Sequence, residues 1–339
     1  MLQRSLRPLF LTAPLVALVA SCDDEAAQML LTCEGGNVEA CYAEGVALIS
    51  HARPQYSEAR RSFSSACMKD IHPTLKTGDP ERARAQWEAR AKSCHALGRL
   101  VRDAKGGPKD LPRAVDLFEI ACKAQPDGSQ TQSTGPVVPE ACVDLAHAIY
   151  DSEGIPPEPE RAVELVRTAC QSDPPDHRAC TLLGTAFYAG KGMRKKDIER
   201  ALELFEASCA SEYAPACVKA GDLLAARTRN DASLAAAAYS KGCALDARLG
   251  CYELADLHAK KGFPGASNGK ASEYYQKTCS IDPTRGCFEA AQLMLEGKVL
   301  AREGQIESLF NTACDHGHTE ACAKRQLDRQ QLQRVMQRK

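Results

Sequence analysis

The fold is decided by the stretch from Cys180 to Cys217, which reads CTLLGTAFYAGKGMRKKDIERALELFEASCASEYAPAC. Its apolar and small residues recur at helical spacing on both sides of a glycine turn at 190–192. The stretch therefore predicts two amphipathic helices folded into a hairpin. The same template recurs before and after it, which indicates an all-α array of helical hairpins rather than one globular core.

Composition narrows the possible functions only slightly. The 339 residues are 44% hydrophobic and 26% charged, with a formal net charge of -1. These values fit either one large core or one long array of repeats. A nearly neutral chain lacks the excess of lysine and arginine that neutralises phosphates, so we expect no nucleic-acid partner.

Two positions of the repeat are almost constant when the hairpins are aligned on their cysteines. Four residues before the first cysteine of each pair, the chain carries a large side chain: Phe63, Phe118, Val166, Phe205, Tyr239, Tyr275 and Phe310. Four residues after the second cysteine it carries a small residue: Gly45, Gly98, Ala146, Gly184, Gly221, Ala255 and Ala291. Glycine costs a helix interior up to about 1 kcal/mol. We therefore interpret the small residues as helix-crossing points, where a neighbour approaches the backbone.

The N-terminus predicts export. Arg4 and Arg7 precede an apolar run over 9–20, which is too short to span a bilayer and is typical of a signal peptide. The run ends in Val19-Ala20-Ser21-Cys22, which resembles the bacterial lipobox. That resemblance implies cleavage before Cys22 and a lipid anchor on it, in the inner or the outer membrane. The alternative is an ordinary signal peptide with Cys22 as a free thiol.

The remaining cysteines predict a ladder of disulfides. The chain has 17 cysteines, and assigning Cys22 to lipid leaves sixteen. No CxxC motif occurs, which argues against zinc-ribbon and thioredoxin sites. Successive helices of a solenoid bring the end of one helix close to the first turn of the next, within the Cα separation that a bridge needs. We therefore predict eight sequential bridges: Cys33–Cys41, Cys67–Cys94, Cys122–Cys142, Cys170–Cys180, Cys209–Cys217, Cys243–Cys251, Cys279–Cys287 and Cys314–Cys322.

The stretch from 183 to 209 contains, in this order, leucine-glycine, an aromatic residue, a Gly-x-Gly turn, aspartate, alanine, a second aromatic residue, alanine and cysteine. This series resembles the Sel-like repeat, a relative of the tetratricopeptide repeat, and the cysteines eight apart resemble the Helicobacter cysteine-rich proteins. The resemblance covers about 25–325. It implies a right-handed α/α solenoid in the bacterial cell envelope, with a partner-binding role.

The same pattern gives expected domain bounds. We expect a signal peptide over 1–21, a lipid anchor and N-terminal capping helix over 22–37, seven hairpin repeats over 38–318 and a C-terminal capping helix over 319–339. Proline in a first helical turn at 80 predicts an extended helix there. The polar, turn-rich insertion over 126–135 predicts a loop.

A candidate ligand groove follows from the first helix of each hairpin. Residues one, five and eight after each second cysteine lie away from the small crossing residues, and the resemblance places this face on the concave side of the solenoid. These positions are rich in the aromatic and arginine side chains of binding surfaces. The candidates are Tyr42, His95, Arg99, Arg102, His147, Tyr150, Thr181, Thr185, Tyr188, Asp222, Tyr252 and Asp256. The set is basic in its N-terminal half and acidic at 222 and 256, and the alternative is a row of ordinary solvated helix residues.

Signals of catalysis are few. The chain has no G-x-S-x-G, no H-E-x-x-H and no complete phosphate loop. Ser267 to Lys270 fits S-x-x-K and 76–78 fits K-T-G, but their order is reversed relative to β-lactamases and no S-D-N lies between them. His316 and His318 could hold a metal weakly, although a solvated loop is the simpler interpretation.

The leading hypothesis is a non-enzymatic envelope lipoprotein that binds a protein, a peptide or a cell-wall fragment in its groove. We expect no catalytic residue, cofactor or metal. Two alternatives remain open. One is a β-lactam-binding or weakly hydrolysing protein, which the resemblance to the cysteine-rich proteins suggests. The other is a structural spacer with no specific ligand.

Overall fold

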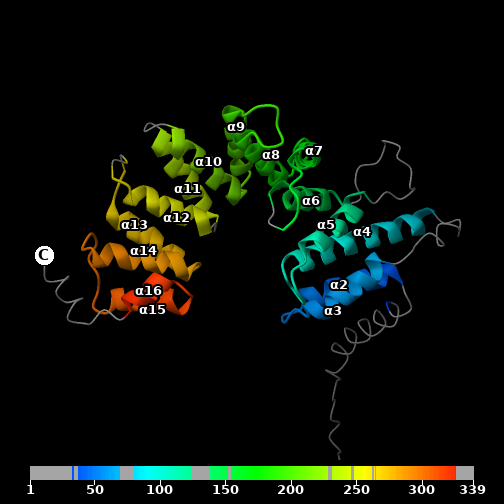
Figure 1. The fold of residues 1–339 in the computed structure, drawn as a ribbon, viewed down its shortest axis with the longest axis horizontal. Helices are drawn as coiled ribbons and strands as arrows, with labels where there is room; N and C mark the ends of the chain where they lie inside the picture. Colours follow the sequence, from blue (N-terminus) through cyan, green and yellow to red (C-terminus); the bar gives the residue numbers. More distant parts are fainter. Residues whose placement is uncertain are drawn as a thin grey trace, which may run out of the picture. The chain divides into compact units, whose positions relative to one another are not determined.

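The computed structural model describes residues 33, 37–68, 80–123, 138–151, 154–227, 231–245, 248–261, 263 and 265–325. Throughout this part of the chain the regular secondary structure is helical, without strands. The chain divides into two compact units, 1–158 and 159–339, and each is an array of helices packed in chain order. The predicted all-α solenoid of helical hairpins is confirmed (Figure 1).

In the first unit, the described residues form two hairpins and one further long helix. Its helices are α2 (Val38–Ser50), α3 (Tyr56–Cys67), α4 (Pro80–Arg102), α5 (Leu111–Lys123) and α6 (Pro139–Asp151). The proline predicted to lie in a first turn begins α4, which is the longest of them at 23 residues. The first helices α2 and α4 also contact one another, so successive hairpins pack through their first helices as well as through their ends.

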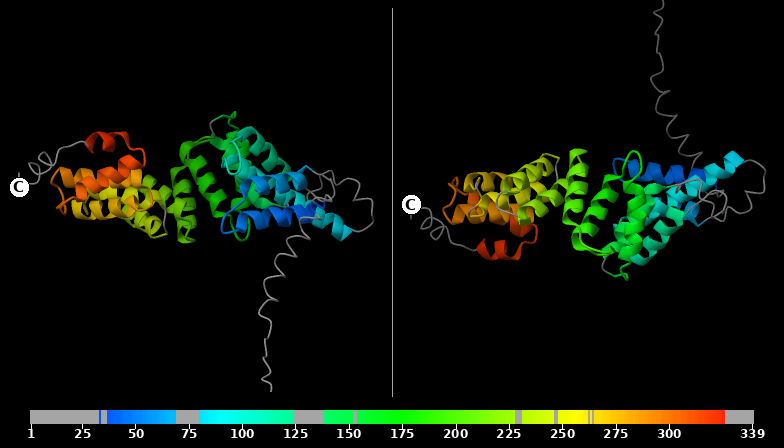
Figure 2. Two further views of the ribbon diagram at one scale, coloured as in Figure 1. Left: turned by 90° about the horizontal axis from the view of Figure 1, so that it is seen from below. Right: turned by 90° about the horizontal axis from the view of Figure 1, so that it is seen from above.

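The second unit continues the pattern. Its helices are α7 (Pro159–Cys170), α8 (His177–Ala189), α9 (Ile198–Ala210), α10 (Ala214–Arg227), α11 (Ala232–Ala244), α12 (Arg248–Ala259), α13 (Asn268–Cys279), α14 (Pro283–Leu295), α15 (Gln305–Asp315) and α16 (Thr319–Lys324). Consecutive helices from α10 to α15 contact one another in chain order, and Figure 2 shows their yellow-green to orange ribbons packed together. The boundary between the units falls after 158, so α6 belongs to the first unit and α7 to the second.

The turn between α8 and α9 shows how the sequence shapes a hairpin. Gly190 caps the end of α8 in the left-handed conformation, at φ 75°, and Gly192 has φ 74°. This region is open to glycine without steric cost. Asp197 then caps α9, because its side chain accepts a hydrogen bond from the backbone N–H of Arg200 at 3.0 Å.

Several predicted features lie outside the described residues. They are the signal peptide over 1–21, Cys22, most of the N-terminal capping helix, the K-T-G motif at 76–78, the insertion over 126–135 and the end of the C-terminal helix after 325. They stay predictions. Within the described residues, none of the helices combines the length and the apolar character that crossing a membrane requires.

The predicted helix-crossing points are confirmed at the four glycines, and in each case the neighbour is the large ring of the same hairpin. A Cβ atom built on Gly45, Gly98, Gly184 or Gly221 would lie only 2.5–2.7 Å from the nearest ring atom of Phe63, Phe118, Phe205 or Tyr239 respectively. All four rings are buried. A methyl group has no room in these contacts, because interiors pack at crystal-like density.

All eight sequential disulfides are present in the structure. The Cα atoms of the bridged cysteines lie 4.4–4.8 Å apart. The bridge between Cys209 and Cys217, for example, joins the end of α9 to the first turn of α10. The two long connections keep the same pairing, Cys67 with Cys94 and Cys122 with Cys142. So many bridges are typical of an oxidising compartment outside the cytoplasm.

The ring-on-glycine contact predicts the effect of adding one methyl group. Gly184→Ala should lower the free energy of unfolding by about 1–3 kcal/mol, because the new Cβ would press on the buried ring of Phe205. Urea unfolding followed by circular dichroism, with the disulfides intact, measures this. Gly269→Ala is the matched control: Gly269 is exposed near the start of α13, and its nearest neighbour would be 3.6 Å from the added atom. Equal effects at the two positions would contradict the interpretation.

Candidate partner-binding surface

In the first unit, two of the predicted groove residues converge on a carboxylate. His95 and Arg102 lie on α4, and Asp144 lies on α6. One oxygen of Asp144 is 2.7 Å from Nε2 of His95, and the other accepts a hydrogen bond from Nη1 of Arg102 at 3.0 Å. Asp144 is only 2% exposed. This carboxylate joins consecutive first helices and supplies a counter-charge to the half of the groove that the sequence predicted to be basic.

The other predicted groove residues of the first unit differ in exposure. Arg99 and His147 are exposed. Tyr42 is half-buried, with its ring 6.1 Å from that of Phe63, and Tyr150 is buried. Half of these candidates therefore contribute to packing within the repeats, and Arg99 and His147 offer their side chains to solvent.

The groove residues of α8 contribute little polar surface. The hydroxyl of Thr181 donates to the carbonyl of His177, and that of Thr185 donates to the carbonyl of Thr181 at 2.9 Å. Both hydroxyls are thus bonded back to their own helix. Tyr188 is the exception, because 47% of this side chain is exposed.

Two tyrosine–aspartate pairs organise the C-terminal part of the surface. The hydroxyl of Tyr239 on α11 donates to Asp222 on α10 at 2.9 Å, and the hydroxyl of Tyr275 on α13 donates to Asp256 on α12. Burial raises the pKa of both phenols far above the ordinary value, and the bonded aspartates raise it further. Both hydroxyls therefore stay protonated and hold their aspartates in place.

These pairs follow a rule that can be read in the sequence. Tyrosine replaces phenylalanine or valine at the ring position only in the α10–α11 and α12–α13 hairpins. Aspartate occurs five residues after the second cysteine only at 222 and 256, in the same two hairpins. A tyrosine hydroxyl at the edge of the core needs a hydrogen-bond partner. The tyrosine that adds this hydroxyl and the aspartate that accepts its hydrogen bond therefore occur in the same hairpins.

Two glutamates complete a cluster of carboxylates that sequence reasoning missed. Glu253 on α12 and Glu289 on α14 are half-buried. Burial raises the pKa of Glu253, and the neighbouring charges of Asp222 and Asp256 raise it further. Burial also raises the pKa of Glu289, with Asp256 again contributing. We call Asp222, Glu253, Asp256 and Glu289 together the acidic surface.

An aromatic and a cationic side chain border the acidic surface. The ring of Tyr252 lies 5.5 Å from that of Tyr275 and is 7% exposed. The guanidinium of Arg285, which is exposed, lies 4.1 Å from the centre of the Tyr252 ring. Tyr252 is therefore enclosed by its neighbours, and Arg285 covers it.

The signal for the missed acids was a position, not a residue type. Asp144, Glu253 and Glu289 each stand two residues after a second cysteine. The predicted groove used only the positions one, five and eight residues after that cysteine. Including the second position would have found all three carboxylates.

Two sequence features could have indicated catalysis or metal binding: Ser267 of the S-x-x-K motif, and the pair His316 and His318. Both are engaged in local structure. Ser267 caps α13, where its side chain accepts a hydrogen bond from the backbone N–H of Lys270 at 3.3 Å. His318 caps α16 and stacks on Phe288, with ring centres 4.1 Å apart, while Nδ1 of His316 lies 2.8 Å from the carbonyl oxygen of Thr312. Among the described residues, no group of three or more histidine, cysteine, aspartate or glutamate side chains is arranged to hold a metal ion.

Comparisons with known proteins agree with this architecture. The Sel1 repeat model matches residues 91–126, 139–174 and 177–213. A Sel1 repeat protein from Oxalobacter formigenes has a similar structure, with a TM-score of 0.57 and 17% identity over 81% of this chain and 99% of that one. A protective antigen of uropathogenic Escherichia coli with an SLR fold gives a TM-score of 0.49 and 18% identity, over 91% of this chain and 70% of that one. A search of curated proteins finds no significant match. The three matched segments have the Sel1 repeat pattern, and the Oxalobacter structure supports the fold.

The raised pKa values of Glu253 and Glu289 predict a dependence of stability on pH. Both carboxyls bind protons more tightly in the folded than in the unfolded chain. Their contribution to the free energy of unfolding is therefore fully present below the pKa of the unfolded chain, about 4.3, and is lost as the pH rises through their pKa in the folded chain. We expect the double variant Glu253→Gln with Glu289→Gln to melt at a higher temperature than the wild type near about pH 7. The difference should shrink towards about pH 4.

Thermal melting at several pH values measures this dependence. Glu273→Gln is a suitable control, since Glu273 is an exposed glutamate on α13 outside the acidic surface. A difference between the double variant and the wild type that stays constant with pH would contradict the assignment.

Proposed function

We propose that the protein is a non-enzymatic scaffold of the bacterial cell envelope whose hairpin array binds a protein or peptide partner. The observation that carries the proposal is the acidic surface, where carboxylates of α10, α12 and α14 gather on consecutive first helices. A partner segment rich in lysine or arginine complements this charge.

Rigidity supports the same function. The hydroxyls of Tyr239 and Tyr275 fix two of the four carboxylates before any partner arrives. Disulfides at the junctions Cys209–Cys217, Cys243–Cys251 and Cys279–Cys287 restrain the helices that carry them. A surface that is already ordered loses less conformational entropy on binding, which favours affinity.

Neutralising the acidic surface tests the binding role. We expect a variant with Glu253→Gln, Asp256→Asn and Glu289→Gln to capture its partner about tenfold less well than the wild type in a crosslinking pull-down from intact cells. The amides keep the size of the side chains and still accept the hydroxyl of Tyr275. The matched control neutralises three exposed glutamates elsewhere in the second unit, with Glu203→Gln, Glu273→Gln and Glu307→Gln.

The outcomes of this experiment separate the possible roles. Equal capture by the two triple variants would contradict binding through the acidic surface. If neither the wild type nor any variant captured anything, a structural spacer would be favoured. Peptidoglycan instead of protein in the captured fraction would identify a cell-wall fragment as the partner.

We also propose that lipid on Cys22 anchors the scaffold to a membrane. The lipobox-like sequence over 19–22 supports this, as does the odd number of cysteines, because the other sixteen are all paired. Lipidation of a cysteine thiol would leave the ladder of bridges complete.

Metabolic labelling with a palmitate analogue tests the anchor. The wild type should be labelled, and Cys22→Ser should not be. Ser21→Ala is the control, since it keeps a small residue before the cysteine and should be labelled normally. Equal labelling of the wild type and Cys22→Ser would show that the lipid is absent or attached elsewhere.

A further inference from the structure

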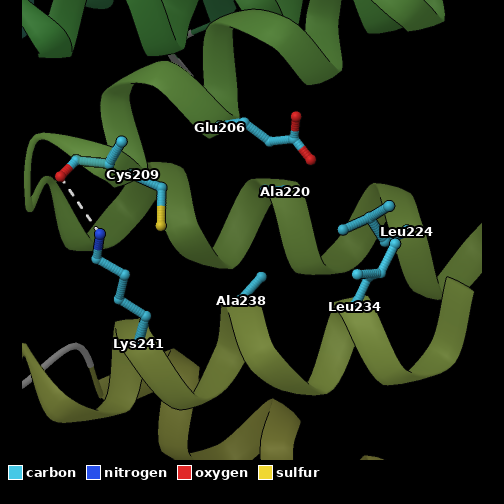
Figure 3. A pocket seen from close by; sticks show the side chains of 8 residues that line it. Glu206, Cys209, Ala220, Leu224, Leu234, Ala238 and Lys241 are labelled. Atoms are coloured by element: carbon cyan, nitrogen blue, oxygen red, sulfur yellow. Dashed lines mark hydrogen bonds between the residues drawn. The ribbon is translucent and has the colours of Figure 1, made fainter.

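The second unit contains a small apolar pocket outside the acidic surface. It lies between α9, α10 and α11 and has a volume of about 230 Å³. Figure 3 places Ala220 on one helix and Ala238 on the next, with Leu224 and Leu234 together at one end. The charged side chains of Glu206 and Lys241 border it away from the leucines.

The pocket lies at a repeat position that carries a leucine or tyrosine in five of the seven hairpins and a small residue, Ser62 or Ala238, in the other two. The residues five before the first cysteine of each hairpin are Ser62, Leu117, Leu165, Leu204, Ala238, Tyr274 and Leu309. In the hairpin that follows the pocket, Tyr274 packs against two buried clusters and stacks on His258, with ring centres 5.8 Å apart. Alanine at 238 leaves the equivalent space open.

The size and lining of this space fit a side chain from outside the chain. Apolar cavities of about 150 Å³ accept a benzene molecule, so the pocket has room for one leucine or phenylalanine side chain. Leu234 is 55% exposed, which leaves an apolar wall facing solvent. The leucine that other hairpins supply themselves can here be supplied by a partner.

The charged residues at the border of the pocket indicate which type of residue would lie beside an apolar side chain bound in it. Nζ of Lys241 donates to the carbonyl of Ala210 at 3.3 Å, so its charge is directed to the C-terminal end of α9. Glu206 is exposed and has no cationic partner in the part of the chain that the structure describes. A lysine or arginine next to the anchor would pair with it.

We propose that this pocket docks a partner protein segment through one leucine-type side chain, flanked by a basic residue that pairs with Glu206. The site does not depend on the acidic surface, because none of the residues that line it belongs to that surface and its main contact is apolar. Either can therefore fail in an experiment without the other. Burying the exposed wall of Leu234 supplies the favourable free energy of docking.

Filling the pocket tests the proposal. Ala238→Leu installs the leucine found in four other hairpins, and Ala237→Leu adds the same side chain at an exposed position of the same helix as a control. Displayed random peptides are selected on the disulfide-bonded protein. We expect the selected peptides to share one apolar residue beside lysine or arginine, and to bind Ala238→Leu about tenfold more weakly than the wild type or the control.

Two further variants keep the test decisive if Ala238→Leu folds poorly. Leu234→Ser removes the exposed wall and should weaken peptide binding, and Glu206→Gln should remove the preference for the basic residue. Unchanged peptide binding in Ala238→Leu and Leu234→Ser, or peptides without a shared apolar residue, would overturn the proposal. It would also be overturned if sedimentation showed a dimer of the wild type that Ala238→Leu abolishes, because the occupant would then be a second copy of the chain.

Discussion

The contact between one large ring and one small residue sets the geometry of the hairpins. In four of them the ring lies so close to a glycine that no Cβ atom fits between them. This contact sets how closely the two helices of a hairpin approach. It thereby places the cysteine four residues after the ring, and the disulfide and the next first helix follow from that position. Close packing of this kind tolerates little change in volume.

The same contact explains how a polar surface arose from a core position. Replacing phenylalanine by tyrosine at 239 and 275 keeps the ring and adds a hydroxyl at the edge of the core. The hydroxyl must be satisfied, and aspartates on the facing helices accept its hydrogen bond. Two fixed carboxylates then stand close to the glutamates of α12 and α14, where burial and mutual repulsion favour the protonated forms. A packing residue and a charged surface are therefore linked.

The sequence alone predicts the parts of this structure that repeat from hairpin to hairpin. The ring positions and the small crossing residues follow from distances of four residues along a helix, and the cysteine pairs follow from the junctions between successive helices. Contacts between consecutive first helices do not follow from such spacing. Asp144 on α6 bonds to His95 and Arg102 on α4, with α5 between them in the chain, so a groove predicted to be basic contains a buried acid. The pocket beside Ala238 was not predicted from the sequence for the same reason, since its walls come from three helices.

Each disulfide joins cysteines that are close together in the sequence, and this affects the order in which the bridges can form. No bridge in the structure joins cysteines more than 27 residues apart, and five of the eight span only eight residues. Each pair is therefore complete as soon as one short segment has emerged from the machinery that makes or moves the chain. Oxidation can then follow the chain from its N-terminal end, one junction at a time. Sixteen free cysteines can pair in a very large number of ways. Oxidation in chain order limits each cysteine to its neighbour in the sequence, so that the eight bridges form one after another.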